Sequence, residues 1–220
     1  MKPRVIHILS CLMFIALFAT ACSDESGSRL PAVRMDMVIA DVDADGNVNN
    51  ILVDNGNNFF VSENKRGPFL DIQDARIRAI AYYQPFYEQM EAVIRDIAPI
   101  QVILPLAPHQ AGITKQDPVE LVRIWSGGGF LNIEMSIRAK SLAKHKVAFV
   151  DGFFGLYSNV VNLEFYHSKE DDILAANQNL FVSIPLSIYY ERFQGQAFEV
   201  YFRLNTWKGF KNYKINIGAL

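Results

Sequence analysis

Three acidic residues near the start of the chain have the spacing of calcium ligands. Asp41, Asp43 and Asp45, followed by Gly46, match positions one, three, five and six of a calcium-binding loop. That loop also needs a bidentate carboxylate at position twelve, where this chain has Leu52. An Asp-Gly pair is typical of a tight hairpin turn. We therefore favour a hairpin and keep the three acids only as a weak calcium candidate.

Three consecutive glycines are a candidate for phosphate binding. Phosphate-binding glycine loops normally lead into a helix, whose N-terminus adds a favourable dipole. After Gly127-Gly128-Gly129, residues 130–137 instead alternate in polarity as a strand does. The glycines are therefore expected to form a hairpin turn.

Glu164 and His167 are the best pair for metal or acid–base chemistry. Residues three apart on a strand point to opposite faces, so this pair could not share a metal ion or a proton there. His109, His145 and His167 lack ligand spacing, and no Gly-x-Ser-x-Gly motif occurs. We therefore predict no catalytic residues, no metal and no cofactor, and expect the protein not to be an enzyme.

Aromatic residues are the remaining candidates for binding. Rings on an exposed sheet can stack on sugars, peptides or bases. Most of the aromatic residues are expected to fill the cores. Tyr201 stands in the polar row of its predicted strand and Trp207 lies in the same aromatic cluster, so these two are kept as weak ligand candidates.

Cys22 gives the clearest functional signal, because it directly follows an export peptide. Residues 1–21 combine a cationic start, an apolar run and a small-residue cleavage site, as a lipoprotein signal peptide does. Lipid on Cys22 would hold the mature protein on a membrane. The apolar run is too short for a spanning helix, which disfavours an uncleaved anchor. Cleavage by an ordinary signal peptidase, giving a soluble secreted protein, is the fallback.

The residues after the cysteine, 22–33, are expected to form a flexible tether, since they have little to bury. Asp24 and Glu25 resemble the acidic surface-export signal of some Gram-negative lipoproteins. The predicted location is the cell envelope, at the outer membrane through a palmitate-type anchor, with exposure at the cell surface as a further expectation.

Composition excludes some classes of function. The chain has 21 basic and 23 acidic residues and a pI near 6.1, which disfavours a nucleic-acid partner. It has two cysteines, and Cys11 would leave with the signal peptide, so no internal disulfide can form. Half of the residues are hydrophobic, which permits a fold held by core packing alone.

Strand signals begin directly after the tether. Turn signals at 44–47 and 54–57 separate apolar alternation into strands near 35–43, 48–54 and 58–62. Residues 71–104 are ambiguous: a helix beginning at Asp71 and two strands, 77–86 and 92–104, fit about equally well. Residues 105–118 contain three prolines and are predicted to be a linker between two domains.

Clean alternation follows in residues 119–220. One row of the strand near 131–138 is apolar and the other, which begins at Asn132, is polar. Similar strands are expected near 119–126, 146–151, 161–166, 180–186, 198–204 and 210–217, with Pro185 at an edge or a kink. Seven strands in about 100 residues predict two packed antiparallel sheets, an immunoglobulin-like sandwich without a disulfide.

The string Ile124-Trp-Ser-Gly-Gly-Gly-Phe-Leu-Asn-Ile-Glu134, with the lipoprotein signal and the order of strands, resembles the NigD-like lipoproteins. The resemblance implies an all-β protein with an N-terminal OB-like barrel over 34–104 and a C-terminal β-sandwich over 119–220. It favours strands at 76–86 and 91–104. It also implies an outer-membrane or cell-surface location, and it supplies no ligand residues.

These observations favour a non-enzymatic, lipid-anchored interaction protein. Its partners would be the membrane, through the anchor, and an envelope protein, a peptide or a glycan, but not nucleic acid. The alternative is a bacteriocin-associated immunity or defence lipoprotein, which rests on the family resemblance. A hydrolase of envelope polymers is a third hypothesis, for which no residue pattern argues.

Overall fold

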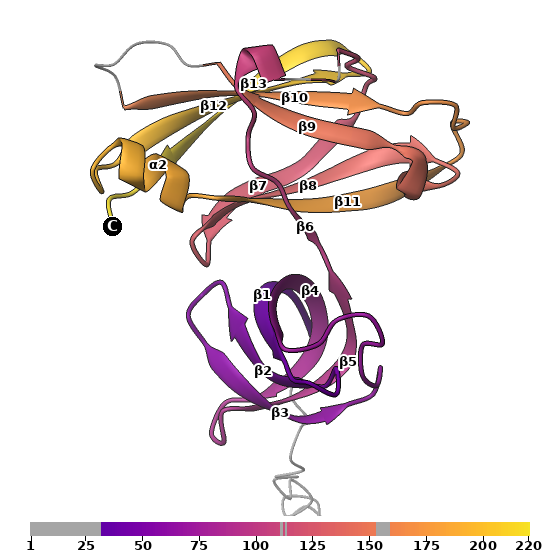
Figure 1. Cartoon of the computed structure of the whole chain (residues 1–220), viewed down its shortest axis with the longest axis vertical. Helices are drawn as coiled ribbons and strands as arrows, with labels where there is room; N and C mark the ends of the chain where they lie inside the picture. The colour runs from indigo at the N-terminus through magenta and orange to yellow at the C-terminus, as the bar shows by residue number, and fades with distance from the viewer. Residues whose placement is uncertain (1–31, 111, 113, 153–158) are drawn as a thin grey trace, which may run out of the picture. The chain divides into compact units, whose positions relative to one another are not determined.

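The computed structural model describes residues 32–110, 112, 114–152 and 159–220. The predicted signal peptide, 1–21, and Cys22 lie outside the described residues, as does the tether, 22–33, except for its last two residues. Within the described part a closed barrel is followed by two sheets, which confirms the predicted all-β class (Figure 1). No helix in this part is long and apolar enough to cross a bilayer.

The barrel is built from five strands whose apolar faces point inwards. They are β1 (Arg34–Val42), β2 (Val48–Val53), β3 (Asn58–Asn64), β4 (Ala75–Phe86) and β5 (Glu91–Pro99). They pair in the order β1-β2-β3-β5-β4, and the pairing of β1 with β4 closes the sheet. Val38, Ile51, Phe59 and Ile94 are fully buried inside it. The OB-like barrel implied by the resemblance is therefore confirmed.

The ambiguous segment, 71–104, is β-structure from residue 75 onwards. β4 and β5 pair antiparallel from Ala79 with Pro99 to Phe86 with Glu91, so the helix alternative is wrong. Pro85 and Pro99 lie at or near strand ends, where a missing N–H breaks little of the ladder. The next residues, β6 (Gln101–Val102), pair with a strand of the second domain instead of continuing β5.

The second domain is a β-sandwich, and each of its seven predicted strands is present. They are β7 (Glu120–Gly127), β8 (Phe130–Ala139), β9 (Lys146–Asp151), β10 (Val160–Ser168), β11 (Ala176–Pro185), β12 (Phe198–Thr206) and β13 (Gly209–Ile217). One sheet has the order β13-β12-β10-β9 and the other β6-β11-β8-β7. Ile133, Phe149, Leu163 and Phe202 meet in the core between them. The short helical elements are η1 (Pro108–Gln110), η2 (Leu142–Lys144) and α2 (Ser187–Arg192).

Two pairings depart from the predicted antiparallel sheets. β10 pairs parallel with β12, and β11 pairs parallel with β6. β10 and β12 are separated in sequence by β11, which belongs to the opposite sheet, so the chain returns to the first sheet in its original direction. Pro185 is the last residue of β11, so it ends that strand.

The predicted linker, 105–118, is bonded to the sandwich at both of its ends. Leu106 exchanges backbone hydrogen bonds with Phe149 (2.8 Å) and Asp151 (2.9 Å) of β9. Further on, Asp117 N–H donates to the carbonyl of His167 (2.8 Å) on β10. Leu106 is therefore bonded to β9 and Asp117 to β10, two neighbouring strands of the same sheet.

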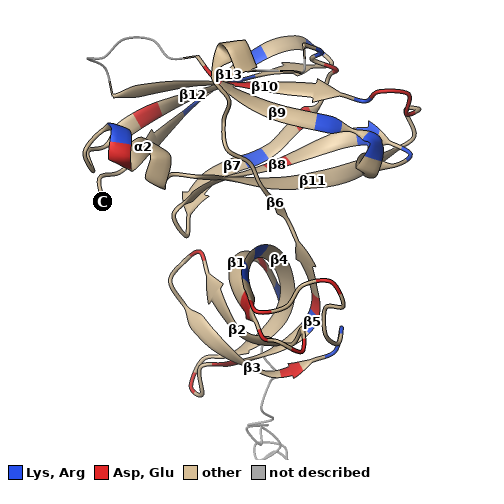
Figure 2. Cartoon of the chain, viewed as in Figure 1, with Lys and Arg blue, Asp and Glu red and all other residues tan. Residues whose placement is uncertain are grey.

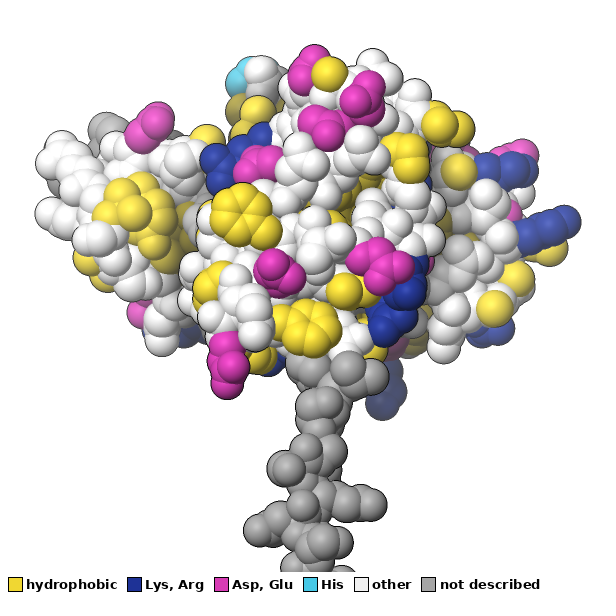
Figure 3. All heavy atoms as spheres, turned by 90° about the horizontal axis from the view of Figure 1, so that it is seen from below, with side chains coloured by type: hydrophobic (Ala, Val, Ile, Leu, Met, Phe, Trp, Pro, Cys, Tyr) yellow, Lys and Arg dark blue, Asp and Glu magenta, His cyan; other side chains and the backbone are white. Residues whose placement is uncertain are grey.

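Charge is mixed over the surface. Lys and Arg are interspersed with Asp and Glu in the sandwich (Figure 2). A space-filling view from below shows apolar side chains exposed between acidic and basic ones (Figure 3). The described part of the chain presents no large face of a single charge in these views.

Candidate functional site

The sheet β13-β12-β10-β9 carries a hollow of about 380 Å³ on the face that points away from the sandwich core. This volume is within the range of pockets that hold small molecules. We call it the Tyr201 hollow, and its lining includes Pro108, Asn162, Glu164, Tyr201, Arg203 and Asn212.

Strand register brings these side chains together. Asn162 of β10 pairs with Tyr201 of β12, and Glu164 pairs with Arg203. Arg203 in turn pairs with Asn212 of β13. Side chains alternate between the two faces of a strand, so paired residues share a face. The apolar residues between them, such as Phe202, point into the core.

Glu164 is the most heavily bonded group in the hollow. It forms an ion pair with Arg203 (Nη1–Oε1, 3.2 Å) and accepts hydrogen bonds from Gln116 (3.0 Å) and Tyr166 (3.2 Å). Burial, and then the charge of Glu164, raise the pKa of Tyr166, so its phenol stays protonated and donates. The positive and negative charges in the hollow therefore largely offset each other.

Tyr201 combines an exposed ring with a fixed position. Its side chain is 38% exposed, and its hydroxyl donates to Glu199 at 3.2 Å. Lys214 binds the same carboxylate at 2.6 Å and lies 5.7 Å from the ring centroid. The hydrogen bond from Lys214 is the main reason why the pKa of Glu199 is lowered. These contacts hold the ring in place, with the Lys214 ammonium over the ring and more than a third of the side chain still exposed.

Two amides in the hollow have unused hydrogen-bonding capacity. Among the described residues, neither the Asn162 nor the Asn212 side chain has a hydrogen-bond partner in the protein. A primary amide offers two donors and an acceptor. The Tyr201 hollow therefore combines an exposed aromatic ring, two free amides and a balanced charge pair.

Trp207, the other aromatic candidate, lies elsewhere. It is 46% exposed and lines a smaller hollow of about 110 Å³ with Arg138, Lys169 and Leu174. Tyr201 does not line this hollow, so the structure does not combine the two candidates in one site.

The acidic turn near the N-terminus has the geometry of a hairpin. Asp43 uses one carboxylate oxygen to accept the backbone N–H groups of Asp45 (3.0 Å) and Asn47 (2.8 Å). The bond from Asn47 is the main cause that lowers the pKa of Asp43. Asp41 forms a separate, exposed ion pair with Arg76 at 3.3 Å. In the described part of the chain, no three His, Cys, Asp or Glu residues are grouped so that they could hold a metal ion.

Two histidines that the spacing did not link are in direct contact. His145 Nδ1 lies 2.8 Å from His167 Nε2, and His145 Nε2 lies 3.1 Å from a carboxylate oxygen of Asp172. His167 Nδ1 lies 3.0 Å from the carbonyl oxygen of Asp117. Glu164 and His167 do point to opposite faces of β10, as predicted.

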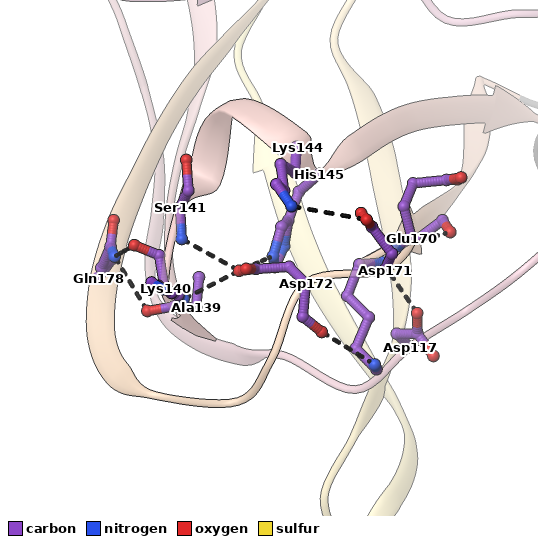
Figure 4. Close-up of polar contacts among 12 residues, drawn as sticks. Asp117, Ala139, Lys140, Ser141, Lys144, His145, Glu170, Asp171, Asp172 and Gln178 are labelled. Carbon is purple, nitrogen blue, oxygen red and sulfur yellow. Dashed lines mark hydrogen bonds and ion pairs between the residues drawn. The ribbon is translucent and has the colours of Figure 1, made fainter.

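Asp172 anchors this chain of contacts. The oxygen that faces His145 also accepts the backbone N–H groups of Lys140 (2.8 Å) and Ser141 (3.0 Å), as Figure 4 shows. The bond from Ser141 is the main cause that lowers the pKa of Asp172 to about 2, so the carboxylate is charged at neutral pH.

Counting donors assigns the protons. A carbonyl only accepts, so His167 donates through Nδ1, and its Nε2 can accept a bond from His145. His145 donates through Nε2 to Asp172, because the Asp172 carboxylate is charged and can only accept. Burial is the main cause that lowers the pKa of His167, in keeping with a neutral ring. All four ring nitrogens are thus engaged within the protein.

The glycine-rich string of residues 124–134 lies against the barrel. The Arg78 guanidinium of β4 pairs with Asp54 (Nη1–Oδ1, 2.6 Å) and donates to the Asn132 side-chain oxygen at 2.9 Å. Ser183 donates to the same oxygen (2.7 Å), and the Asn132 amide donates to Asp54 (2.8 Å). We call these four residues the interdomain clamp.

The glycines of the string form the hairpin that was predicted. Gly128 (φ 59°) and Gly129 (φ 83°) connect β7 to β8, and both left-handed conformations suit a two-residue hairpin turn. A side chain on Gly128 would collide with the Asp54 carboxylate. The next residue, Phe130, packs under the Arg78 guanidinium at 4.6 Å. These residues therefore connect the two domains.

Comparisons with known proteins address the fold. Residues 102–217 match the family described as the NigD-like C-terminal beta sandwich domain. A NigD-like immunity protein from Bacteroides caccae has a similar structure, with a TM-score of 0.69 at 24% identity over 84% of this chain and 92% of that chain. No curated protein matches the sequence.

Two other solved structures are similar. A proposed toxin-related protein from Parabacteroides distasonis has a TM-score of 0.69 at 16% identity, over 85% of this chain and 94% of that chain. A proposed lipoprotein from Bacteroides fragilis has a TM-score of 0.63 at 16% identity, over 86% of this chain and 99% of that chain. At these identities the likeness concerns the fold alone.

Proposed function

Because this chain belongs to the NigD-like family, we propose that it is a non-enzymatic, lipid-anchored protein of the cell envelope that binds a ligand in the Tyr201 hollow. The family match agrees with the resemblance inferred from residues 124–134. Cys22 after a small-residue cleavage site supports the anchor, and the solved structure described as a lipoprotein adds to it. The outer membrane, with the protein facing the cell exterior, is the location that the acidic Asp24 and Glu25 favour.

The composition of the Tyr201 hollow carries the proposal of binding. An exposed ring and two free amides suit a ligand with apolar faces and many hydroxyl groups. The charge of Glu164 is offset by Arg203, so the hollow has no surplus charge for an ionic ligand. We therefore assign an uncharged oligosaccharide as the ligand class, in preference to a peptide or an envelope protein.

The titratable groups near the surface already form hydrogen bonds within the protein, which supports a role without catalysis. A general base needs a nitrogen or oxygen free to take a proton from a substrate. His145 and His167 use all of their ring nitrogens internally, and Glu164 already accepts from three neighbours. The mixed charges of the surface likewise argue against nucleic acid (Figure 2).

A glycan array followed by titration calorimetry tests the binding proposal. The wild type should bind uncharged oligosaccharides. Tyr201→Ala should weaken binding at least ~5-fold, if a sugar face stacks on the ring about as well as a nucleobase does, which contributes about 1–3 kcal/mol. Trp207→Ala removes an aromatic ring that is exposed to a similar degree but lies outside the hollow, so this variant should bind as the wild type does. Absence of any glycan ligand, or equal losses in the two variants, would contradict the proposal.

Bacteriocin immunity is the second candidate, because a structurally similar protein is described as a NigD-like immunity protein. Under this alternative, deletion of the gene would sensitise the cell to a cognate bacteriocin, and the full-length protein would restore resistance. Unchanged sensitivity after deletion would reject it.

A further inference from the structure

Exposed apolar side chains gather where the described chain begins. We call them the anchor-side patch: Val33 (54% exposed), Phe60 (68%), Tyr87 (48%) and Met90 (39%). They come from the start of β1, from β3 and from the β4–β5 turn. From this arrangement and the proposed anchor we infer that the anchor-side patch rests on the surface of the bilayer that holds the lipidated N-terminus.

Backbone hydrogen bonds connect three members of the patch, Phe60, Met90 and Tyr87. Phe60 N–H donates to the Met90 carbonyl at 2.9 Å, and Met90 N–H donates to the Tyr87 carbonyl at 3.4 Å. The Tyr87 ring packs on the buried Phe59 ring, with centroids 5.6 Å apart. Met90 has a φ of 52°, a left-handed conformation that methionine rarely adopts.

The patch is adjacent to the start of the barrel. Arg34, the first residue of β1, donates to the Tyr87 hydroxyl at 3.3 Å, and Val33 directly precedes it. Any segment that leads from Cys22 into the barrel must therefore join it beside the patch.

The short segment between Cys22 and the barrel argues that a membrane is what covers the anchor-side patch. Cys22 and Ala32 are ten residues apart, which is at most about 36 Å when fully extended. A lipid on Cys22 would thus keep the anchor-side patch close to the bilayer throughout the life of the protein. Aromatic residues with a polar tip, such as Tyr87, are favoured at the membrane interface.

The charges around the patch suit a headgroup layer of mixed charge. Arg34 supplies a cation, while Glu88 and Glu91 are exposed anions beside Phe60 and Met90. A purely anionic surface would be repelled by the two glutamates. Vesicles rich in zwitterionic phosphatidylethanolamine are therefore the appropriate probe.

A single-thiol experiment tests the inference on the full-length lipidated protein. Cys22 would be the only cysteine of the mature chain, and lipidation blocks its thiol, so Phe60→Cys and Met90→Cys each provide one reactive site. Each variant is labelled with an environment-sensitive fluorophore and reconstituted into phosphatidylethanolamine–phosphatidylglycerol vesicles with nitroxide-labelled lipid. Labels at positions 60 and 90 should shift their emission to the blue and be quenched by the nitroxide.

Leu70→Cys is the matched control. Leu70 is 91% exposed, and its neighbour Phe69 bonds to Gly46 in the β1–β2 turn, at the opposite end of β1 from Arg34. A label there should remain in water and unquenched. Patch labels that behave like the label at position 70, on protein that stays with the vesicles, would overturn the docking inference alone.

The inference rests on the proposed anchor. The same samples distinguish a failure of the anchor from a failure of the docking alone. Labelling of Cys22 in the wild type, or release of the protein from the vesicles, would overturn the anchor and the docking together. A blue shift without nitroxide quenching would indicate contact between copies of the protein and would also overturn the docking.

Discussion

His145 and His167 contact each other, and all four of their ring nitrogens are engaged within the protein. No sequence pattern indicates this pair, because the residues are 22 apart and their contact depends on the pairing of β9 with β10. Asn132 was placed correctly on the outer row of its strand, yet it is fully buried rather than exposed to solvent. Alternation predicts which face a residue takes, but it cannot show that another domain covers that face.

Stability should depend on pH through this pair. Burial lowers the pKa of His167 below its ordinary value of 6.5, so below that pH the unfolded chain binds a proton that the folded chain does not. The unfolding free energy should therefore fall between pH 7 and pH 5, by at most ~1.4 kcal/mol per pH unit for one proton. Below about pH 4 the loss of the Asp172 charge, whose folded pKa is about 2, should lower it further.

Urea denaturation at pH 7 and pH 5 measures this effect. His167→Gln should reduce the difference between the two pH values, whereas His109→Gln, at an exposed position, should leave it unchanged. Equal pH dependence in all three proteins would contradict the assignment.

At the scale of elements, alternation predicted all seven main strands of the sandwich because one row of each faces a single core. Alternation did not determine the secondary structure of residues 71–104, because their apolar residues fit both helical and strand spacing. Pairing with the barrel strands β1 and β3 decides that these residues form strands. The two-residue β6 could not be foreseen, because its pairing with β11 comes from the second domain.

The interdomain clamp should be a strong determinant of stability. Arg78→Met would leave the Asp54 carboxylate without its cation and would remove one of the two donors to the buried Asn132 oxygen. Breaking a buried ion pair in this way costs about 3–5 kcal/mol. Arg76→Met is the matched control two residues away, since its ion pair with Asp41 is exposed and should cost ~1 kcal/mol or less. Chemical denaturation of both variants checks this, and similar losses would contradict the clamp.

The hairpin glycines provide a second test at this scale. Gly128→Ala and Gly129→Ala both place a side chain at positive φ, but only the first meets the Asp54 carboxylate. Gly128→Ala should therefore lower the denaturation midpoint clearly more than Gly129→Ala. Equal midpoints for the two variants would show that the hairpin does not approach the barrel as described.

At the scale of the whole molecule, two β domains joined by the interdomain clamp would be held at a membrane by a short N-terminal segment. The family and the fold class could be predicted from the sequence, because the string 124–134 and the strand patterns are local features. Of the residues that line the Tyr201 hollow, only Tyr201 could be predicted from the sequence as a ligand candidate. Its other groups come from β10, β12, β13 and the segment before β7, which no local pattern brings together.

Attachment of lipid at Cys22 is the central claim, because the location, the docking of the anchor-side patch and a role in the envelope all depend on it. The most direct measurement is metabolic labelling with an alkyne palmitate analogue, followed by membrane fractionation, of the wild type and Cys22→Ser. The wild type should carry the label and sediment with membranes, while the variant should be unlabelled. Equal labelling of the two proteins, or an unlabelled wild type in the soluble fraction, would contradict the account.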